Sequence, residues 1–205
     1  VMLMERIVAQ EYCDTETRKE QIASAVLKIS AGEGFSAVTL ERVAREIGVV
    51  PSAVYRHYPN KSVMIDGALD LVKERILQNI EEVRAEVDDP LEFLRALLYR
   101  HIGFVVNDLG AGGTFFSIEV ASHYPEKKQK IHENMLILRK EVLRCVNAAR
   151  KQKRIRDDIN ADQVVNLYFG MFVPAVMQFQ LHGNMKTLQK TIDDNWSVFC
   201  TLMAV

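Results

Sequence analysis

The sequence predicts an all-α protein of about nine helices. Apolar residues recur with helical spacing along nearly the whole chain of 205 residues. No segment shows the strict alternation of apolar and polar residues that is typical of a half-buried strand. With 48% hydrophobic residues, the chain can bury a sizeable core, either as one domain or as two small ones.

The most informative segment is residues 39–65, TLERVAREIGVVPSAVYRHYPNKSVMI, which predicts two short helices joined by a tight turn. Thr39 is a suitable cap for the first helix. Gly48 can adopt the positive φ that ends this helix, and Pro51 suits the first turn of the next. The first helix places these apolar residues on one face: Leu40, Val43, Ala44 and Ile47.

The second short helix has Val54 and Tyr58 facing inward and ends at Pro59. Asn60 can cap a long helix whose first turn carries Lys61, where exposed backbone amides suit a phosphate. The arrangement is that of a helix-turn-helix whose second helix docks in the DNA major groove. Its outward or lateral side chains suit bases and phosphates: Ser52, Ala53, Tyr55, Arg56 and His57.

These residues resemble the amino-terminal domain of TetR-type transcriptional regulators. The resemblance rests on residues 17–35 (TRKEQIASAVLKISAGEGF) and on these positions: Thr39, Val43, Ala44, Gly48, Val49, Tyr55, Tyr58 and Lys61. It implies a helix-turn-helix DNA-binding domain over residues 1–60 and a helical ligand-binding and dimerisation domain over residues 61–205. The family usually has a small hydroxyl residue at the position of Val50, and often a glycine or basic residue near Pro51 and Ser52. The resemblance therefore does not specify the operator.

The expected partners are a palindromic double-stranded DNA operator, a second copy of the chain and a mostly apolar small-molecule effector. The net charge of −1 and a weak local basic patch predict modest non-specific DNA affinity. A scaffold or ligand-binding dimer whose helix-turn-helix contacts protein is the alternative, because the same side chains suit a protein surface. The expected DNA contacts are Thr39, Arg42, Pro51, Ser52, Ala53, Tyr55, Arg56, His57, Tyr58 and Lys61.

Beyond this segment the pattern predicts a long helix of about 27 residues linking the two domains. Glycines at 110–113 are expected to interrupt the helices that follow, and Gly183 separates the last two. The predicted helices after the first long one are 90–109, 114–122, a long helix ending near Lys153, 160–181 and 185–202.

The second domain is richer in aromatic residues and methionine than simple packing requires, which favours an apolar cavity beside the glycine break. The hypothesis is that a bound effector tilts the long linking helix and separates the two reading heads. A helical core is the alternative for each residue. The candidate ligand-binding residues are Phe93, Tyr99, His101, Phe104, Phe115, Phe116, Glu119, Met135, Arg139, Tyr168 and Phe172.

The last two predicted helices are apolar around much of their girth, so they must be covered on more than one side. Two copies packed as a four-helix bundle would give two-fold symmetry and a palindromic operator. The candidate dimer-interface residues are Tyr168, Phe172, Val176, Phe179, Ile192, Trp196 and Phe199.

Catalytic and metal motifs are absent from the sequence, so an enzyme is not expected and neither a cofactor nor a metal is implied. His132 and Glu133 begin an HExxH pattern, but Leu136 replaces its second histidine. Cys13, Cys145 and Cys200 lack CxxC spacing. We find no run apolar and long enough to span a bilayer and no cleavable leader, which predicts a cytoplasmic protein.

Overall fold

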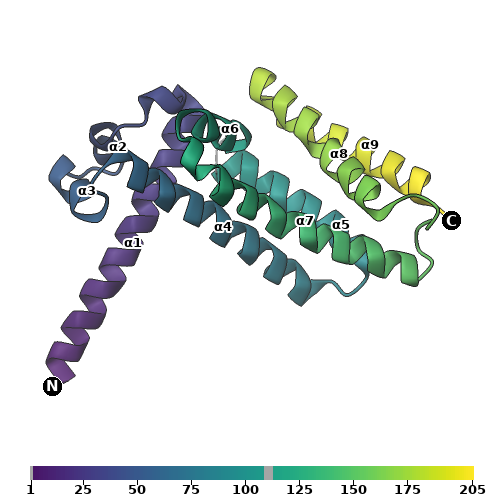
Figure 1. Cartoon of the computed structure of the whole chain (residues 1–205), viewed down its shortest axis with the longest axis horizontal. Helices are drawn as coiled ribbons and strands as arrows, with labels where there is room; N and C mark the ends of the chain where they lie inside the picture. Colours follow the sequence, from purple (N-terminus) through teal and green to yellow (C-terminus); the bar gives the residue numbers. More distant parts are fainter. Residues whose placement is uncertain (1, 109–112) are drawn as a thin grey trace. The chain divides into compact units, whose positions relative to one another are not determined.

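The computed structural model contains nine α-helices and no strand among the residues that it describes, which are residues 2–108 and 113–205 for the backbone and 15–106 and 116–205 for the side chains. The all-α prediction is confirmed (Figure 1). The chain divides into two compact units, one formed by residues 1–73 and 108–128 and the other by residues 74–107 and 129–205. The expected domain boundary after residue 60 stays a prediction.

The first unit is built on α1 (Met2–Glu33), against which α2 (Leu40–Glu46), α3 (Pro51–His57) and α6 (Gly113–His123) pack. It also holds the first half of α4 (Lys61–Glu86) and two short 3₁₀ turns, Phe35–Ala37 and Pro125–Lys127. Its core is formed by side chains that are almost fully buried: Ile22, Val26, Ile29, Val38, Val43, Ala44, Val54, Met64 and Ile65.

An aromatic cluster around Phe35 joins the turn after α1 to α6. Its ring lies 6.2 Å from Phe116, 5.1 Å from His123 and 6.2 Å from Tyr124, measured between centroids. Beside it, the buried Lys127 donates to Asp66 Oδ2 over 2.7 Å. These contacts fix α6 and the turn after it against the helices that carry the helix-turn-helix.

The second unit contains the rest of α4, α5 (Pro90–Gly103), α7 (Lys128–Lys151), α8 (Ala161–His182) and α9 (Met185–Met203). Asp89 accepts the amide protons of Leu91 and Glu92 at the start of α5, and Asn160 and Asn184 cap α8 and α9 in the same way. Gly183 ends α8 with a φ of 64°. The α8 and α9 helices lie side by side (Figure 1).

The α5 helix is shorter than the predicted helix over 90–109. It ends at Gly103 and continues as a π-helical turn, Phe104–Asp108. The predicted break at residues 110–112 lies outside the described residues, and Gly113 is the first residue of α6.

The expectation that no segment is long and apolar enough to span a bilayer was wrong for one helix. Judged by length and composition alone, α8 meets that criterion. Its 22 residues carry apolar side chains on two faces, which raises the hydropathy of the whole segment. One face, including Val164, Tyr168 and Val176, is buried in the second unit, where α8 packs against α9 and α5. Packing in the core of a helical protein accounts for the apolar side chains on this face.

Candidate functional site

Hydrogen bonds and one positive φ angle fix the start of α2 and the turn between α2 and α3. Thr39 Oγ1 accepts the amide proton of Arg42 over 3.0 Å and so begins α2. Gly48 takes a φ of 71°, and the Val49 amide donates to the Ala44 carbonyl over 2.9 Å. Because Val43, Ala44 and Val54 are fully buried, the two short helices are locked together as a helix-turn-helix.

Tyr58 ends α3 and belongs to the core. Its amide donates to the Val54 carbonyl over 2.9 Å, and only 7% of the residue is exposed. Its ring lies on Gly67 of α4 so closely that a Cβ at Gly67 would stand 2.3 Å from the Tyr58 hydroxyl. Tyr58, which was predicted as a DNA contact, therefore does not belong to the exposed surface of α3.

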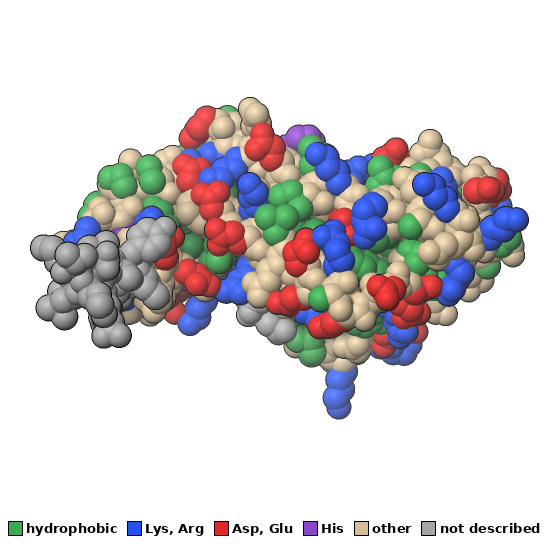
Figure 2. Space-filling view, turned by 90° about the horizontal axis from the view of Figure 1, so that it is seen from below, with side chains coloured by type: hydrophobic (Ala, Val, Ile, Leu, Met, Phe, Trp, Pro, Cys, Tyr) green, Lys and Arg blue, Asp and Glu red, His purple; other side chains and the backbone are tan. Residues whose placement is uncertain are grey.

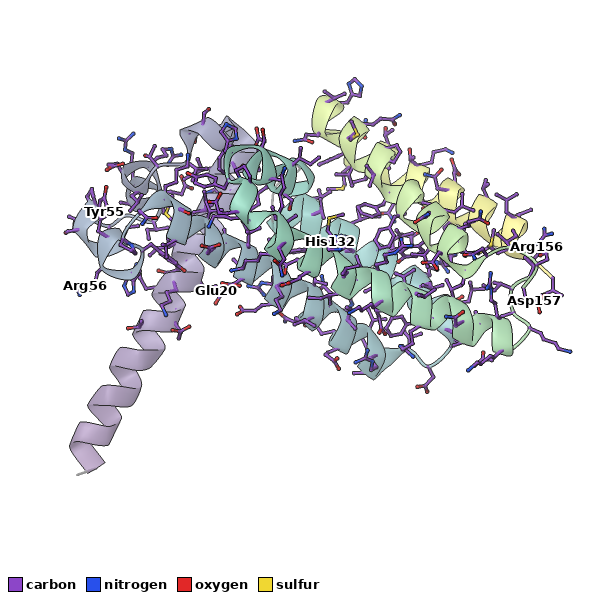
Figure 3. The ribbon with its side chains drawn as sticks, in the orientation of Figure 1. Glu20, Tyr55, Arg56, His132, Arg156 and Asp157 are labelled. Atoms are coloured by element: carbon purple, nitrogen blue, oxygen red, sulfur yellow. The ribbon has the colours of Figure 1, made fainter. Side chains whose placement is uncertain are left out.

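The exposed surface of α3 consists of Pro51, Ser52, Tyr55 and Arg56, preceded by Val50 with 64% of its surface exposed. Tyr55 and Arg56 extend outward from the helix (Figure 3). Two other predicted contacts, Ala53 and His57, lie half-buried at its flanks. Four of the predicted contacts are thus exposed along α3. Together with Val50 they form what we call the reading face, defined as Val50, Pro51, Ser52, Tyr55 and Arg56.

Tyr55 and Arg56 differ in how they are held. The Tyr55 hydroxyl donates to Glu41 Oε1 of α2 over 3.1 Å, and this hydrogen bond raises the pKa of Tyr55. The contact orients the phenol and was not foreseen from the sequence. No hydrogen bond or ion pair ties Arg56 within the part of the chain that the structure describes, so its guanidinium is available to a partner.

Arg42 is engaged within the protein. Its guanidinium lies 2.5 Å from Glu33 Oε1 of α1 and 2.9 Å from Glu46 Oε2 of α2. The hydrogen bond from Arg42 lowers the pKa of Glu33. Its visible role is to fasten α2 to α1, and a phosphate would have to compete with both carboxylates.

Lys61, at the start of α4, is also held. Its Nζ lies 3.3 Å from the Phe35 carbonyl oxygen and 4.6 Å from the centre of the Phe35 ring. Burial lowers the pKa of Lys61. Asn60 caps α4, as expected, by accepting the amide proton of Val63 over 3.0 Å. Of the two predicted helix-end contacts, Thr39 is exposed and Lys61 is half-buried.

The charged side chains of both signs are interspersed on the face of the molecule seen in Figure 2. Lys and Arg side chains there stand next to Asp and Glu, in keeping with the net charge of −1. This face therefore offers no broad basic field.

The second unit contains a small groove of about 140 Å³ between α5 and the start of α9. Its wall includes Tyr99, whose hydroxyl is hydrogen-bonded to Asp193 of α9. The groove is mostly apolar, with polar groups from Tyr99 and Gln189. Its lining residues are Tyr99, Ile102, Gly103, Val106, Met185, Leu188, Gln189 and Ile192.

Of the predicted ligand-binding residues, Tyr99 alone lines this groove. His101 packs against Phe104 and Phe172, with ring centres 6.2 and 5.3 Å apart, and burial lowers the pKa of His101 to about 4. The imidazole is therefore neutral near pH 7, and it would act on a ligand as a dipole instead of a cation.

Other predicted ligand-binding residues of the second unit have partners within it. Phe93 is buried beneath the Arg144 guanidinium, 5.6 Å from its ring centre, and Tyr168 donates to the Leu94 carbonyl over 2.9 Å. Arg139 donates to Asn166 and Asp162 over 2.7 and 2.8 Å, which ties α7 to α8. These three side chains have structural roles.

The remaining predicted ligand-binding residues are scattered. Met135 is 64% exposed on α7, whereas Phe116 and Glu119 belong to α6 in the first unit. The side chain of Phe115 lies outside the described residues. The groove between α5 and α9 is thus built from residues of which the sequence pattern singled out one, Tyr99.

The predicted dimer residues lie inside the protomer. Tyr168, Phe172, Val176, Ile192, Trp196 and Phe199 are each at most 7% exposed, and Phe179 is half-buried. The opposite face of α8 exposes Leu167 by 48%, Met177 by 43% and Leu181 by 78%. Gly170 and Pro174, also exposed, complete a stripe with a three- and four-residue spacing, which we call the α8 stripe.

In this chain a short exposed helix, α3, follows α2 after a turn at Gly48. This arrangement is that of the helix-turn-helix proteins. The family follows from comparison with known families: residues 22–68 match the model "Bacterial regulatory proteins, tetR family", and residues 90–194 match "Tetracyclin repressor-like, C-terminal domain". The second match alone covers about half of the chain. The chain belongs to the TetR family of bacterial regulatory proteins.

Among curated proteins the chain is similar to the nucleoid occlusion factor SlmA. It is 31% identical to SlmA of Vibrio vulnificus strain YJ016 over 94 residues, which are 45% of this chain and 48% of that protein. The similarity to SlmA of Photorhabdus laumondii is 25% over 141 residues, 68% of this chain and 69% of the relative. The match thus spans about half the length of the Vibrio relative.

Solved structures of TetR-family regulators share the fold. A regulator from Chloroflexus aurantiacus superposes with a TM-score of 0.79 at 16% identity, covering 95% of this chain and 98% of the other. The ketosteroid regulator KstR2 of Mycobacterium tuberculosis gives 0.72 at 16% identity, with 92% and 95% covered. At these identities the likeness is one of fold.

Proposed function

We propose that this protein is a transcriptional regulator that binds a palindromic operator in double-stranded DNA. The observation that carries the proposal is the reading face of α3, whose side chains project from a helix locked against α2. In a helix-turn-helix the second helix enters the major groove, where hydroxyl, phenol and guanidinium groups contact base edges and phosphates. Such a regulator acts in the cytoplasm, where bacterial DNA is accessible.

The test is selection of binding sites from a random duplex pool at near-physiological salt, followed by affinity measurements on the selected duplex. We expect a palindrome, and about a tenfold loss of affinity for Arg56→Ala because its guanidinium is free to contact a base. Lys140→Ala, which removes an exposed charge on α7, is the matched control and should change affinity little. Absence of any enriched sequence from pools sampled over a range of salt would favour the protein-contacting alternative.

We further propose that the operator is bound by a homodimer formed through the α8 stripe. A soluble helix that is apolar on two faces needs a second partner, and one face of α8 is already buried within the protomer. A two-fold dimer would present two copies of α3 to the two halves of a palindrome.

We propose that the groove between α5 and α9 binds the apolar part of a small effector, which lowers operator affinity and makes the protein a ligand-responsive repressor. A volume of about 140 Å³ suits a ring or short alkyl chain, with a polar end toward Tyr99 or Gln189. A structurally similar regulator, FadR of Thermus thermophilus, was solved in complex with lauroyl-CoA, which is a property of that protein. Release of DNA requires that the effector bind the two states of the protein unequally.

This site is tested by screening compounds that carry one ring or a short alkyl chain and one polar end for release of the selected duplex. Met185→Trp, which places a bulky ring in the groove, should abolish release while leaving the DNA affinity of the ligand-free protein unchanged. Met135→Trp, at an exposed methionine outside the groove, is the control and should respond like the wild type. Equal release from all three proteins would place the effector elsewhere.

A further inference from the structure

We propose that Val50 and Pro51 form an apolar edge of the reading face that recognises thymine through its 5-methyl group. This inference rests on the proposed DNA-binding function and deepens it. It predicts that each operator half-site carries a thymine at the base pair that meets the start of α3, and that this base is read without a hydrogen bond from the side chain of either residue.

The side chain of Val50 is exposed without a role in capping or in the core. It is the residue that precedes α3, and it makes no side-chain hydrogen bond to the helix. With 64% of its surface exposed, it contrasts with Val54 on the same segment, which is fully buried. One exposed valine is ordinary on a protein surface. Its position is informative, because the N-terminal residues of the second helix contact base edges in helix-turn-helix docking.

The neighbouring groups extend the apolar edge. Pro51 is exposed and has no amide proton to donate. The carbonyl of Val50 is already engaged by the amide of Ala53 over 2.9 Å. The start of α3 therefore presents carbon atoms from two successive side chains, and the first hydroxyl of the reading face is that of Ser52.

Base chemistry assigns a partner to this edge. In the major groove, thymine presents a methyl group in addition to a hydrogen-bond acceptor, whereas guanine, cytosine and adenine present hydrogen-bonding groups only. Side chains without donors or acceptors desolvate those polar groups without compensation, but they gain apolar contact with a methyl group. Among the four bases, thymine is the one that this edge favours.

The other end of the reading face has the opposite chemistry. Arg56 carries donors that suit guanine O6 and N7, the commonest specific contact of arginine. Arg56 follows Pro51 by five positions, which corresponds to a rise of about 7.5 Å along the helix axis. This is on the order of two base-pair steps of 3.4 Å. The proposal therefore places the methyl-read thymine about two steps from a guanine in each half-site.

The test replaces each thymine of the selected operator, one at a time, by deoxyuridine, which removes only the methyl group. For one thymine per half-site we expect about a fourfold loss of affinity per methyl with the wild-type protein. With Val50→Ala the same replacement should have a clearly smaller effect, because Pro51 alone then contacts the methyl group. Leu77→Ala, at a 41% exposed side chain of α4 outside the reading face, should keep the wild-type sensitivity. Thermal melting of each variant confirms that it is folded.

The outcomes separate this inference from the function on which it rests. An operator that binds normally with deoxyuridine at every thymine would overturn the methyl-reading proposal and leave DNA binding intact. Undiminished sensitivity in Val50→Ala would also overturn it, because Val50 would then have no part in reading the methyl group. If no duplex binds specifically, the proposed function fails and the inference fails with it.

Discussion

Replacing Gly67 by alanine is expected to lower the free energy of unfolding by about 3 kcal/mol, near the upper end of the usual range for overpacking. The added Cβ would stand 2.3 Å from the Tyr58 hydroxyl and 2.7 Å from two ring carbons. Tyr58 is buried and forms the end of α3, so its ring cannot swing into solvent without disturbing the helix-turn-helix. Chemical denaturation of the purified variant measures the effect.

A second substitution distinguishes this clash from a general cost of changing a glycine. Tyr58→Leu shortens the side chain, so Gly67→Ala should cost far less in the Tyr58→Leu background than alone. Gly32→Ala is the matched control, because Gly32 lies in α1 with no atom within 4 Å of an added Cβ. It should be neutral or stabilise by up to about 1 kcal/mol. Equal costs for Gly67→Ala in both Tyr58 backgrounds would refute the steric explanation.

The order of the helices could be predicted because local signals mark their ends. Asp89 with Pro90, Asn160 and Gly183 each act on groups within a few residues, so the sequence alone indicates where a helix starts or stops. The glycine turn before α3 is local in the same sense. The contact between Tyr58 and Gly67 is not, since it requires the angle at which α4 leaves the turn.

The engagement of Arg42 shows why part of the predicted DNA surface could not be inferred from the sequence. A basic residue on a short helix suggested a phosphate contact, but Glu33 reaches it from the end of α1. The hydrogen bond from Tyr55 to Glu41 is similar, because it joins two helices whose relative angle follows from buried residues such as Val43 and Val54. Ion pairs and hydrogen bonds between helices depend on tertiary packing.

Helical periodicity is also ambiguous for a helix with two apolar faces. In α8 the larger aromatic side chains, Tyr168 and Phe172, looked like the strongest candidates for an intersubunit contact, yet they are buried against the protomer's own helices. The smaller α8 stripe, which contains a glycine and a proline, remains exposed. The spacing predicted a helix that must be covered on more than one side, whereas the face that is buried depended on how α9 and α5 pack against the helix.

The α8 stripe leads to the second large effect: Met177→Glu should convert the protein from a dimer to a monomer at micromolar concentration. In a two-fold interface the same residue of both subunits lies at self-complementary positions, so the substitution buries two carboxylates at once. Each must lose water without a cation to pair with. Because Met177 is 43% exposed in the protomer, the monomer itself should remain folded. Sedimentation together with circular dichroism measures both properties.

Loss of the dimer should also lower the affinity for the operator, because two linked reading heads bind a palindrome far more tightly than one. Linking two modules typically raises affinity by 10² or more, so Met177→Glu should weaken operator binding by at least about 100-fold. A duplex carrying a single half-site should be bound with nearly equal affinity by the variant and the wild type. Met135→Glu, the same change at a 64% exposed methionine of α7, should keep both the dimer and the affinity. A Met177→Glu protein that stays dimeric would show that the subunits associate through another surface. Its operator affinity would then report whether that other surface also sets the spacing of the two reading heads.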